Sequence, residues 1–265
     1  MECRRRINNE TFSYRNTTNY LSQAKDQGLY PTCYLHALLS LLECKLRMKQ
    51  ACLVKRRAIG NLSVEHVLDG LKKEEIMDGA HPLYSKRVET FLKDHGVAFE
   101  KNYCKGKKGT ANCYKIKRFI KFETGLKKSK VKLVTAVGPK VMRRDSTSSR
   151  SYIEKLKKEL RTNGPLIVSF KLRTGFTELS KNSFLTAEAP YTQVPVPKEG
   201  KDEDVSYKNE WHACVLVGFQ FINGVDCFEI LNSWGTSWSD KGYGFIMASD
   251  VERAYSWEAL EKLSS

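Results

Sequence analysis

The chain has 265 residues, of which 41% are apolar and 28% are charged, and its formal net charge at pH 7 is +15. This length and apolar content suffice to bury the core of one large domain or two lobes, and they exclude a disordered or low-complexity protein. No stretch approaches the roughly 20 consecutive apolar residues of a membrane-spanning helix, which excludes a transmembrane protein.

Residues 1–12 are predicted to be an extension that lacks a secretory signal. Met1–Arg6 is followed by polar residues, whereas a signal peptide continues into an apolar core. We therefore expect a cytoplasmic protein; a lysosomal, vacuolar or extracellular location is the alternative if the natural chain begins further upstream. In the cytoplasm, the eight cysteines are expected to be free thiols. No cysteine pair has CxxC spacing, and we predict no metal site.

The first half of the chain is predicted to be mainly helical. Between Cys33 and Gln50, leucines recur three or four residues apart, which is the spacing of one buried helical face. Pro31 and Thr32 provide a rigid turn and a capping residue just before this segment, so Cys33 should lie in the first helical turn. Further amphipathic helices are predicted at Ser63–Leu71, Leu83–Asp94 and Ser151–Thr162.

The segment Lys101–Lys132 is strongly basic. It carries twelve lysines and arginines and a single acidic residue, Glu123. Because glycines interrupt it, we expect exposed loops whose basic side chains are solvated. Such charge would also suit a nucleic acid, but the segment matches no nucleic-acid-binding module, and a nucleic-acid partner is not expected.

The second half of the chain is predicted to be rich in strands. Short β-prone runs lie at Leu166–Phe170, His212–Phe221, Asp226–Leu231 and Gly242–Met247. Ala187–Asn209 contains three prolines and is expected to be irregular. Helices first and strands later predict an α+β fold, and a cleft between two lobes is the natural place for a functional site.

Three segments carry residues that could act together in catalysis. Cys33 in the first turn of a helix feels the positive end of the helix dipole, which favours the thiolate and makes the sulfur nucleophilic. His212 opens one predicted strand, and Asn232 directly follows the next one. A thiol, an imidazole and a group that orients the imidazole are the set of residues that a cysteine peptidase needs.

Short motifs at these positions resemble those of papain-like cysteine peptidases. Gln27 and Gly28 with Cys33 match the family's Q-G-x4-C element, and Asn232–Gly235 matches its N-S-W-G. Leu62–Asp69 is similar to the family's L-S-x4-L-D stretch. The resemblance extends over roughly residues 13–247.

The resemblance implies an α+β papain-like fold of two lobes with the active site in the cleft between them. Residues 13–265 would form the catalytic domain, with the nucleophile on a helix-rich lobe of about 13–130 and the histidine and asparagine on a β-rich lobe of about 131–265. His212 lies 179 residues after Cys33, which exceeds the usual spacing in this family, so insertions are expected near 101–150 and 187–209.

The resemblance also implies a role for each site residue. Cys33 would attack a peptide carbonyl, His212 would hold and deliver the proton, and Asn232 would orient His212. The Gln27 side-chain amide would donate a hydrogen bond to the oxyanion, together with the Cys33 backbone N–H. Trp234 would shield the histidine from water.

Peptides or proteins are the substrates that the resemblance implies. Gly79 and Ala80 lie in a stretch similar to the one whose backbone pairs with extended substrates in this family. No cofactor is needed for this chemistry, and the protein is expected to act as a monomer.

The chain also departs from the family pattern. Pro31, two residues before Cys33, stands where a glycine is usual, which removes a backbone N–H. Tyr30, Gly70 and Met77 occupy positions where secreted members carry cysteines. Only about a dozen residues precede the mature-like start, so we expect either a protein that needs no long propeptide of the family's kind or a sequence that is part of a longer chain. The alternative is therefore a catalytically impaired papain-like module that binds peptides or a protein partner.

Overall fold

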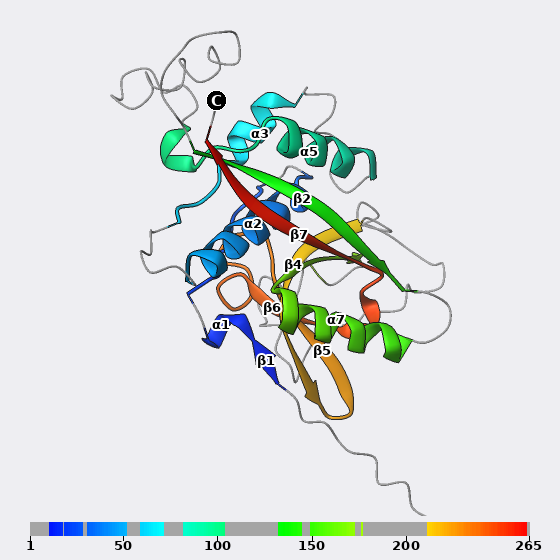
Figure 1. The fold of residues 1–265 in the computed structure, drawn as a ribbon. Helices are drawn as coiled ribbons and strands as arrows, with labels where there is room; N and C mark the ends of the chain where they lie inside the picture. Colours follow the sequence, from blue (N-terminus) through cyan, green and yellow to red (C-terminus); the bar gives the residue numbers. More distant parts are fainter. Residues whose placement is uncertain are drawn as a thin grey trace, which may run out of the picture.

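The computed structural model describes residues 11–17, 19–28, 31–51, 59–71, 82–103, 132–144, 149–172, 176 and 211–263 (Figure 1). Its helices are α1 (Tyr14–Thr17), α2 (Cys33–Ala51), α3 (Val64–Gly70), α5 (Pro82–Asp94) and α7 (Ser149–Asn163), with short 3-10 turns at Glu100–Asn102 and Ala248–Asp250. Its strands are β1 (Phe12–Ser13), β2 (Lys132–Arg143), β3 (Leu166–Lys171), β4 (Trp211–Ile222), β5 (Val225–Leu231), β6 (Tyr243–Met247) and β7 (Arg253–Leu263).

Helix α2 is the buried helix predicted from the leucine spacing. Every residue from Cys33 to Leu46 is buried, including the charged side chains of Glu43 and Lys45. The first helical turn closes with a hydrogen bond from the His36 N–H to the Thr32 carbonyl at 3.1 Å. Cys33 therefore lies at the start of a helix that is buried up to Leu46.

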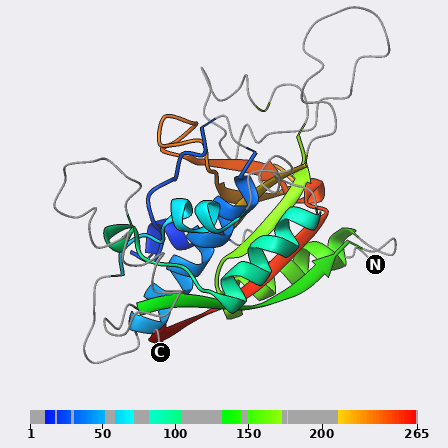
Figure 2. The ribbon, with the colours of Figure 1, turned by 90° about the horizontal axis from the view of Figure 1, so that it is seen from above.

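The strands form one antiparallel sheet in the order β2-β7-β3-β4-β5-β6, and the short β1 pairs with β4. β2 and β7 run side by side over nearly their whole lengths (Figures 1 and 2). β3 lies between β7 and β4, with Ile167 opposite both Tyr255 and Val215. The sheet thus brings the last strand of the chain between strands that come earlier in the sequence.

The sheet separates two hydrophobic cores because successive side chains of a strand point to opposite faces. In β4, Ala213, Val215 and Val217 pack into the core that α2, α3 and α5 cover. Cys214 and Leu216 point to the other face, into the core that includes α7, β5 and β6. Residues near the start of β4 therefore border both cores.

The structure confirms the predicted helices and strands, whose ends agree to within two residues. The long strands β2 and β7 were not predicted. β2 contains Gly138 and Pro139, which in the sequence indicate the end of a strand. In the structure, the pairing with β7 shifts register between Val137 and Lys140, and a bulge of this kind tolerates proline. β7 contains helix-forming residues, and its pairing with β2 overrides that propensity.

Two of the predicted irregular regions lie mainly outside the described residues. These are residues 104–131 of the basic segment, and all of 187–209. Residues 132–143, which fall within the insertion expected near 101–150, form β2 of the sheet. Within the described part of the chain, no helix has both the length and the apolar content needed to cross a membrane.

Candidate active site

Cys33 is the first residue of α2, and it is 4% exposed. In this position its sulfur lies at the helix N-terminus, where the partial positive charge of the helix favours a thiolate. Cys33, Cys44, Cys214 and Cys227 are free thiols, as the sequence predicted; the other four cysteines lie outside the described residues. Pro31, two residues earlier, lies in an exposed bend.

His212 lies in β4 and hydrogen-bonds Asn232, which directly follows β5. The ring Nε2 of His212 lies 2.8 Å from Asn232 Oδ1, and both residues are buried. Because an amide oxygen only accepts hydrogen bonds, Nε2 must carry the hydrogen. In the neutral ring, Nδ1 is then the nitrogen that can take up a proton.

The orientation of Asn232 is fixed by further donors. Its Oδ1 also accepts the backbone N–H of Ser233 at 2.8 Å and the thiol of Cys214 at 3.4 Å. These donors determine which end of the amide faces His212, because rotating the amide by half a turn would place its NH2 group against donor groups. The asparagine is therefore a rigid acceptor for the histidine.

Aromatic rings surround His212. The ring centroid of Trp234 lies 5.0 Å from that of His212, and the rings of Phe170 and Phe176 lie at 5.8 Å. This burial lowers the pKa of His212 to about 4, although the hydrogen bond with Asn232 acts in the opposite direction. The sequence analysis assigned Trp234 a shielding position but missed Phe176, because a single phenylalanine outside any recognised sequence pattern carries no local signal.

Acidification is expected to destabilise the fold through the buried His66. Burial lowers the pKa of His66 to about 4, whereas histidine in an unfolded chain titrates near about 6.5. The contribution of His66 to the free energy of unfolding is therefore complete above the unfolded pKa and is lost as the pH falls toward 4, because the unfolded chain then binds more protons. The expected loss is about 3 kcal/mol.

Urea unfolding at pH 7, 5.5 and 4.5 measures this loss. His66→Gln is the matched variant, because the glutamine oxygen can replace the His66 Nδ1 that accepts the Ala98 N–H at 3.1 Å. We expect its free energy of unfolding to depend less steeply on pH than that of the wild type. A free energy of unfolding that is constant from pH 7 to 4.5 would contradict the assignment of His66 as a neutral buried histidine.

The segment Lys25–Gly28 lies against the loop that follows Asn232. The Gln27 N–H donates to the Ser233 carbonyl at 2.8 Å, and the Gly235 N–H donates to the Lys25 carbonyl at 2.9 Å. The Ser233 hydroxyl donates to Gln27 Oε1 at 2.6 Å. The oxygen end of the Gln27 amide thus faces Ser233, and its NH2 end is the end that can donate a hydrogen bond.

Cys33 is close to this group of residues. It belongs to the same hydrophobic cluster as Ala213, the neighbour of His212 in β4. Burial raises the pKa of the Cys214 thiol well above its usual range, and the charge that Cys33 carries as a thiolate adds to the rise. Cys214 itself contacts Asn232. The start of α2 thus faces the end of the sheet that carries His212 and Asn232.

The described residues account for most of the predicted site. His212 contacts Asn232 and Trp234 directly, Gln27 is joined to this group through Ser233, and Cys33 lies at the adjoining helix start. The predicted binding residues Gly79 and Ala80 lie outside the described residues. Ser233 was not singled out from the sequence as a contact of Gln27, although it is part of the N-S-W-G motif.

Comparison with known proteins identifies related chains. Residues 8–259 match the model of the family described as "Papain family cysteine protease". "Cysteine proteinase 1" of Entamoeba histolytica is 22% identical over 223 residues, which cover 83% of this chain and 58% of that protein. A "Viral cathepsin" of Adoxophyes honmai nucleopolyhedrovirus is 24% identical, over 88% of this chain and 56% of the viral protein. The chain thus spans little more than half the length of either relative.

Solved structures share the fold at low sequence identity. A digestive procathepsin L 3 from the larval midgut of Tenebrio molitor superposes with a TM-score of 0.58 at 17% identity, over 97% of this chain and 72% of that one. A procathepsin B of Trypanosoma congolense gives a TM-score of 0.56 at 15% identity, over 95% and 77% of the two chains. The α+β fold expected from the sequence motifs is confirmed.

Proposed function

The chain belongs to the papain family of cysteine proteases, and we propose that it hydrolyses peptide bonds with Cys33 as the nucleophile and His212 as the proton carrier. The observation that carries this proposal is the buried hydrogen bond of 2.8 Å between His212 and Asn232, beside the start of α2. It presents the histidine with Nδ1 available for a proton, which is the arrangement that a thiol nucleophile requires.

The first step is the transfer of the Cys33 proton to His212. Burial holds the pKa of His212 at about 4, so an isolated imidazolium is disfavoured. The transfer forms the thiolate and the imidazolium together, and their mutual attraction offsets the cost of the buried charge. The N-terminus of α2 stabilises the thiolate, and Asn232 Oδ1 accepts a hydrogen bond from the charged ring.

The thiolate then attacks the carbonyl carbon of a peptide bond. A carbon–sulfur bond forms, and the carbonyl oxygen becomes an oxyanion that the Gln27 amide and the Cys33 N–H can stabilise. The carbon–nitrogen bond breaks as His212 gives its proton to the leaving amine. Water then attacks the thioester, with His212 accepting its proton, and release of the acid restores the thiol.

A binding module without turnover is the second candidate. Two observations favour it: Pro31 removes a backbone N–H beside the site, and the side chains of both Cys33 and His212 are almost fully buried. Under this alternative, peptides bind without being cleaved. Mass spectrometry of a peptide mixture before and after incubation with the protein separates the two, because only the peptidase creates new peptide termini.

Gln27→Ala is expected to lower kcat by about 10²–10³-fold, because it removes one donor to the oxyanion. The rate at which iodoacetamide alkylates Cys33 should stay within twofold of the wild type, since alkylation forms no oxyanion. Ser233→Ala is expected to give a smaller loss, because it frees the Gln27 amide without removing it. Hydrolysis of a fluorogenic peptide and alkylation of the same samples provide both readouts. An unchanged kcat in Gln27→Ala would remove Gln27 from the mechanism.

A further inference from the structure

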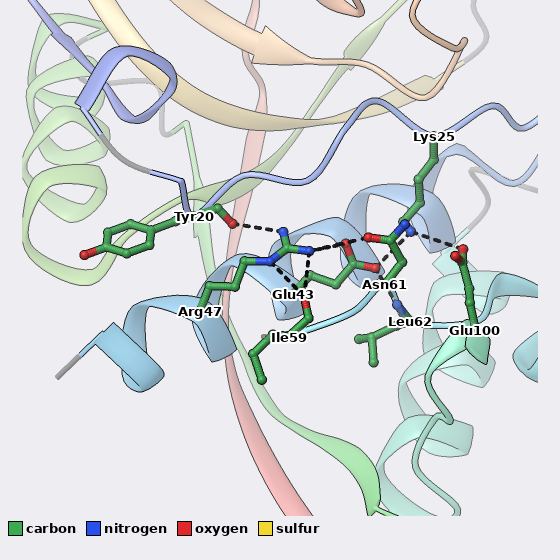
Figure 3. Close-up of polar contacts among 8 residues, drawn as sticks. All are labelled: Tyr20, Lys25, Glu43, Arg47, Ile59, Asn61, Leu62 and Glu100. Atoms are coloured by element: carbon green, nitrogen blue, oxygen red, sulfur yellow. Dashed lines mark hydrogen bonds and ion pairs between the residues drawn. The ribbon is translucent and has the colours of Figure 1, made fainter. Parts of the chain in front are cut away.

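Helix α2 holds a buried carboxylate that the reaction does not use. Glu43 lies ten residues after Cys33 on the same helix, and its side chain is 0% exposed. Its Oε1 accepts the Leu62 N–H at 2.6 Å and lies 2.9 Å from the ammonium of Lys25 (Figure 3). Lys25 is itself only 9% exposed, and Glu100 approaches it at 3.8 Å from the other side. A buried charge pair of this kind needs close geometry to offset desolvation.

A second cation of this network, Arg47, makes different contacts. Its guanidinium donates to the carbonyls of Tyr20 and Ile59 and to the Asn61 side chain, at distances of 3.1 to 3.4 Å (Figure 3). It lies 3.9 Å from Glu43, which is beyond hydrogen-bond distance. Arg47 therefore joins loops to the middle of α2, and within the described part of the chain its polar contacts lie outside the segment Lys25–Gly28.

Lys25 belongs to the Gln27 segment and is fixed at both its side chain and its backbone. The side chain pairs with Glu43, and the carbonyl accepts the Gly235 N–H. Asp26 bridges to Trp234, and the Gln27 N–H donates to Ser233. Gln27 follows Lys25 by only two residues, so the chain limits how far Gln27 can move independently of Lys25.

We propose that the Lys25–Glu43 ion pair positions the Gln27 amide relative to the Cys33 sulfur. The inference rests on the proposed function. Glu43 and Cys33 are carried by one helix, so their separation is set by the rigid geometry of about 1.5 Å per residue. Because Lys25 pairs with Glu43, the ion pair also holds Lys25 in place relative to α2, and Lys25 lies two residues before Gln27. Lys25 and Glu43 are positioning residues, because neither touches the reacting atoms.

Lys25→Met tests this proposal, since methionine keeps an unbranched apolar stem and removes the ammonium. We expect kcat to fall at least tenfold and KM to change less than threefold, with the rate of Cys33 alkylation by iodoacetamide unchanged. Lys25→Arg, which keeps the charge, should restore most of kcat. Arg47→Met is the matched control: it removes the other cation of the network and should lower Tm while leaving kcat within threefold of the wild type.

Hydrogen exchange of the Gln27 N–H provides a readout that needs no turnover. It should speed up at least tenfold in Lys25→Met and stay at the wild-type rate in Arg47→Met, because only the first variant loosens the bond to Ser233. If Lys25→Met does not fold, Lys25→Met/Glu43→Gln removes both charges, keeps an acceptor for Leu62 and carries the same expectations.

Three results would overturn the proposal. They are equal losses of kcat in Lys25→Met and Arg47→Met, a loss of Cys33 alkylation in Lys25→Met that parallels its loss of kcat, and an unchanged exchange rate of the Gln27 N–H in Lys25→Met. Failure of the proposed function would look different. The wild type would then cleave no peptide, whereas the difference in exchange between the two variants would still report whether the ion pair positions Gln27.

Discussion

Cys33→Ala is expected to abolish peptide hydrolysis, with a loss of roughly 10⁴-fold or more, and to leave the fold intact. No other side chain can replace the nucleophile, and residual activity in such variants reflects binding and oxyanion stabilisation alone. Alanine is the strongest helix former and fits the start of α2. Hydrolysis of a fluorogenic peptide, together with thermal unfolding, measures both expectations.

Cys44→Ala is the matched control for this loss. Cys44 lies on the same helix and is also buried, and burial raises the pKa of its thiol to about 12, so it is not a nucleophile near neutral pH. We expect the Cys44 variant to keep at least half of the wild-type kcat. If Cys33→Ala retained more than 1% of the wild-type activity, the nucleophile would be a different residue.

His212→Ala is expected to lower kcat by roughly 10³-fold or more. Without the imidazole, no group takes the Cys33 proton or returns it to the leaving amine. The substitution also leaves Asn232 Oδ1 without its ring donor and opens a cavity between Trp234 and Phe176, so some loss of stability is expected as well. The activity is compared at a temperature where circular dichroism shows the variant to be folded.

His66→Gln separates the catalytic loss from a general effect of losing a buried histidine. His66 is buried in α3, and its pKa is also lowered to about 4 by burial. Its ring contacts Phe91 and Tyr103, and its Nδ1 accepts the Ala98 N–H. We expect His66→Gln to reduce stability but to keep kcat within threefold. A similar loss of kcat in both variants would contradict a specific role for His212.

The elements that carry the site could be predicted because their signals are local. The leucine spacing that begins at Cys33 identifies α2, and alternating or continuous apolar runs identify the strands around His212 and Asn232. The motif at Gln27 and the motif at Asn232 could be recognised separately. That they form a single hydrogen-bonded unit through Ser233 follows only from the folded chain.

The remaining features depend on contacts between distant parts of the sequence. β7 becomes a strand because β2 pairs with it, 120 residues or so earlier in the chain, whereas its own residues favour a helix. Glu43 interrupts an apolar run and reads as a surface residue, yet it is fully buried because Lys25 and the Leu62 N–H bind its carboxylate. Phe176 is one of the aromatic residues around His212, but no pattern in the sequence next to it predicts this contact.

The measurement that most directly tests the central claim is the alkylation of individual cysteines by iodoacetamide as a function of pH, mapped by mass spectrometry, in the wild type and in His212→Ala. At pH about 5.5, only a thiol with a strongly lowered pKa reacts. The Cys33–His212 pair predicts selective labelling of Cys33 in the wild type that disappears in His212→Ala. Labelling of Cys33 no faster than that of Cys44, or equal labelling in both proteins, would contradict the pair and leave the peptide-binding module as the function.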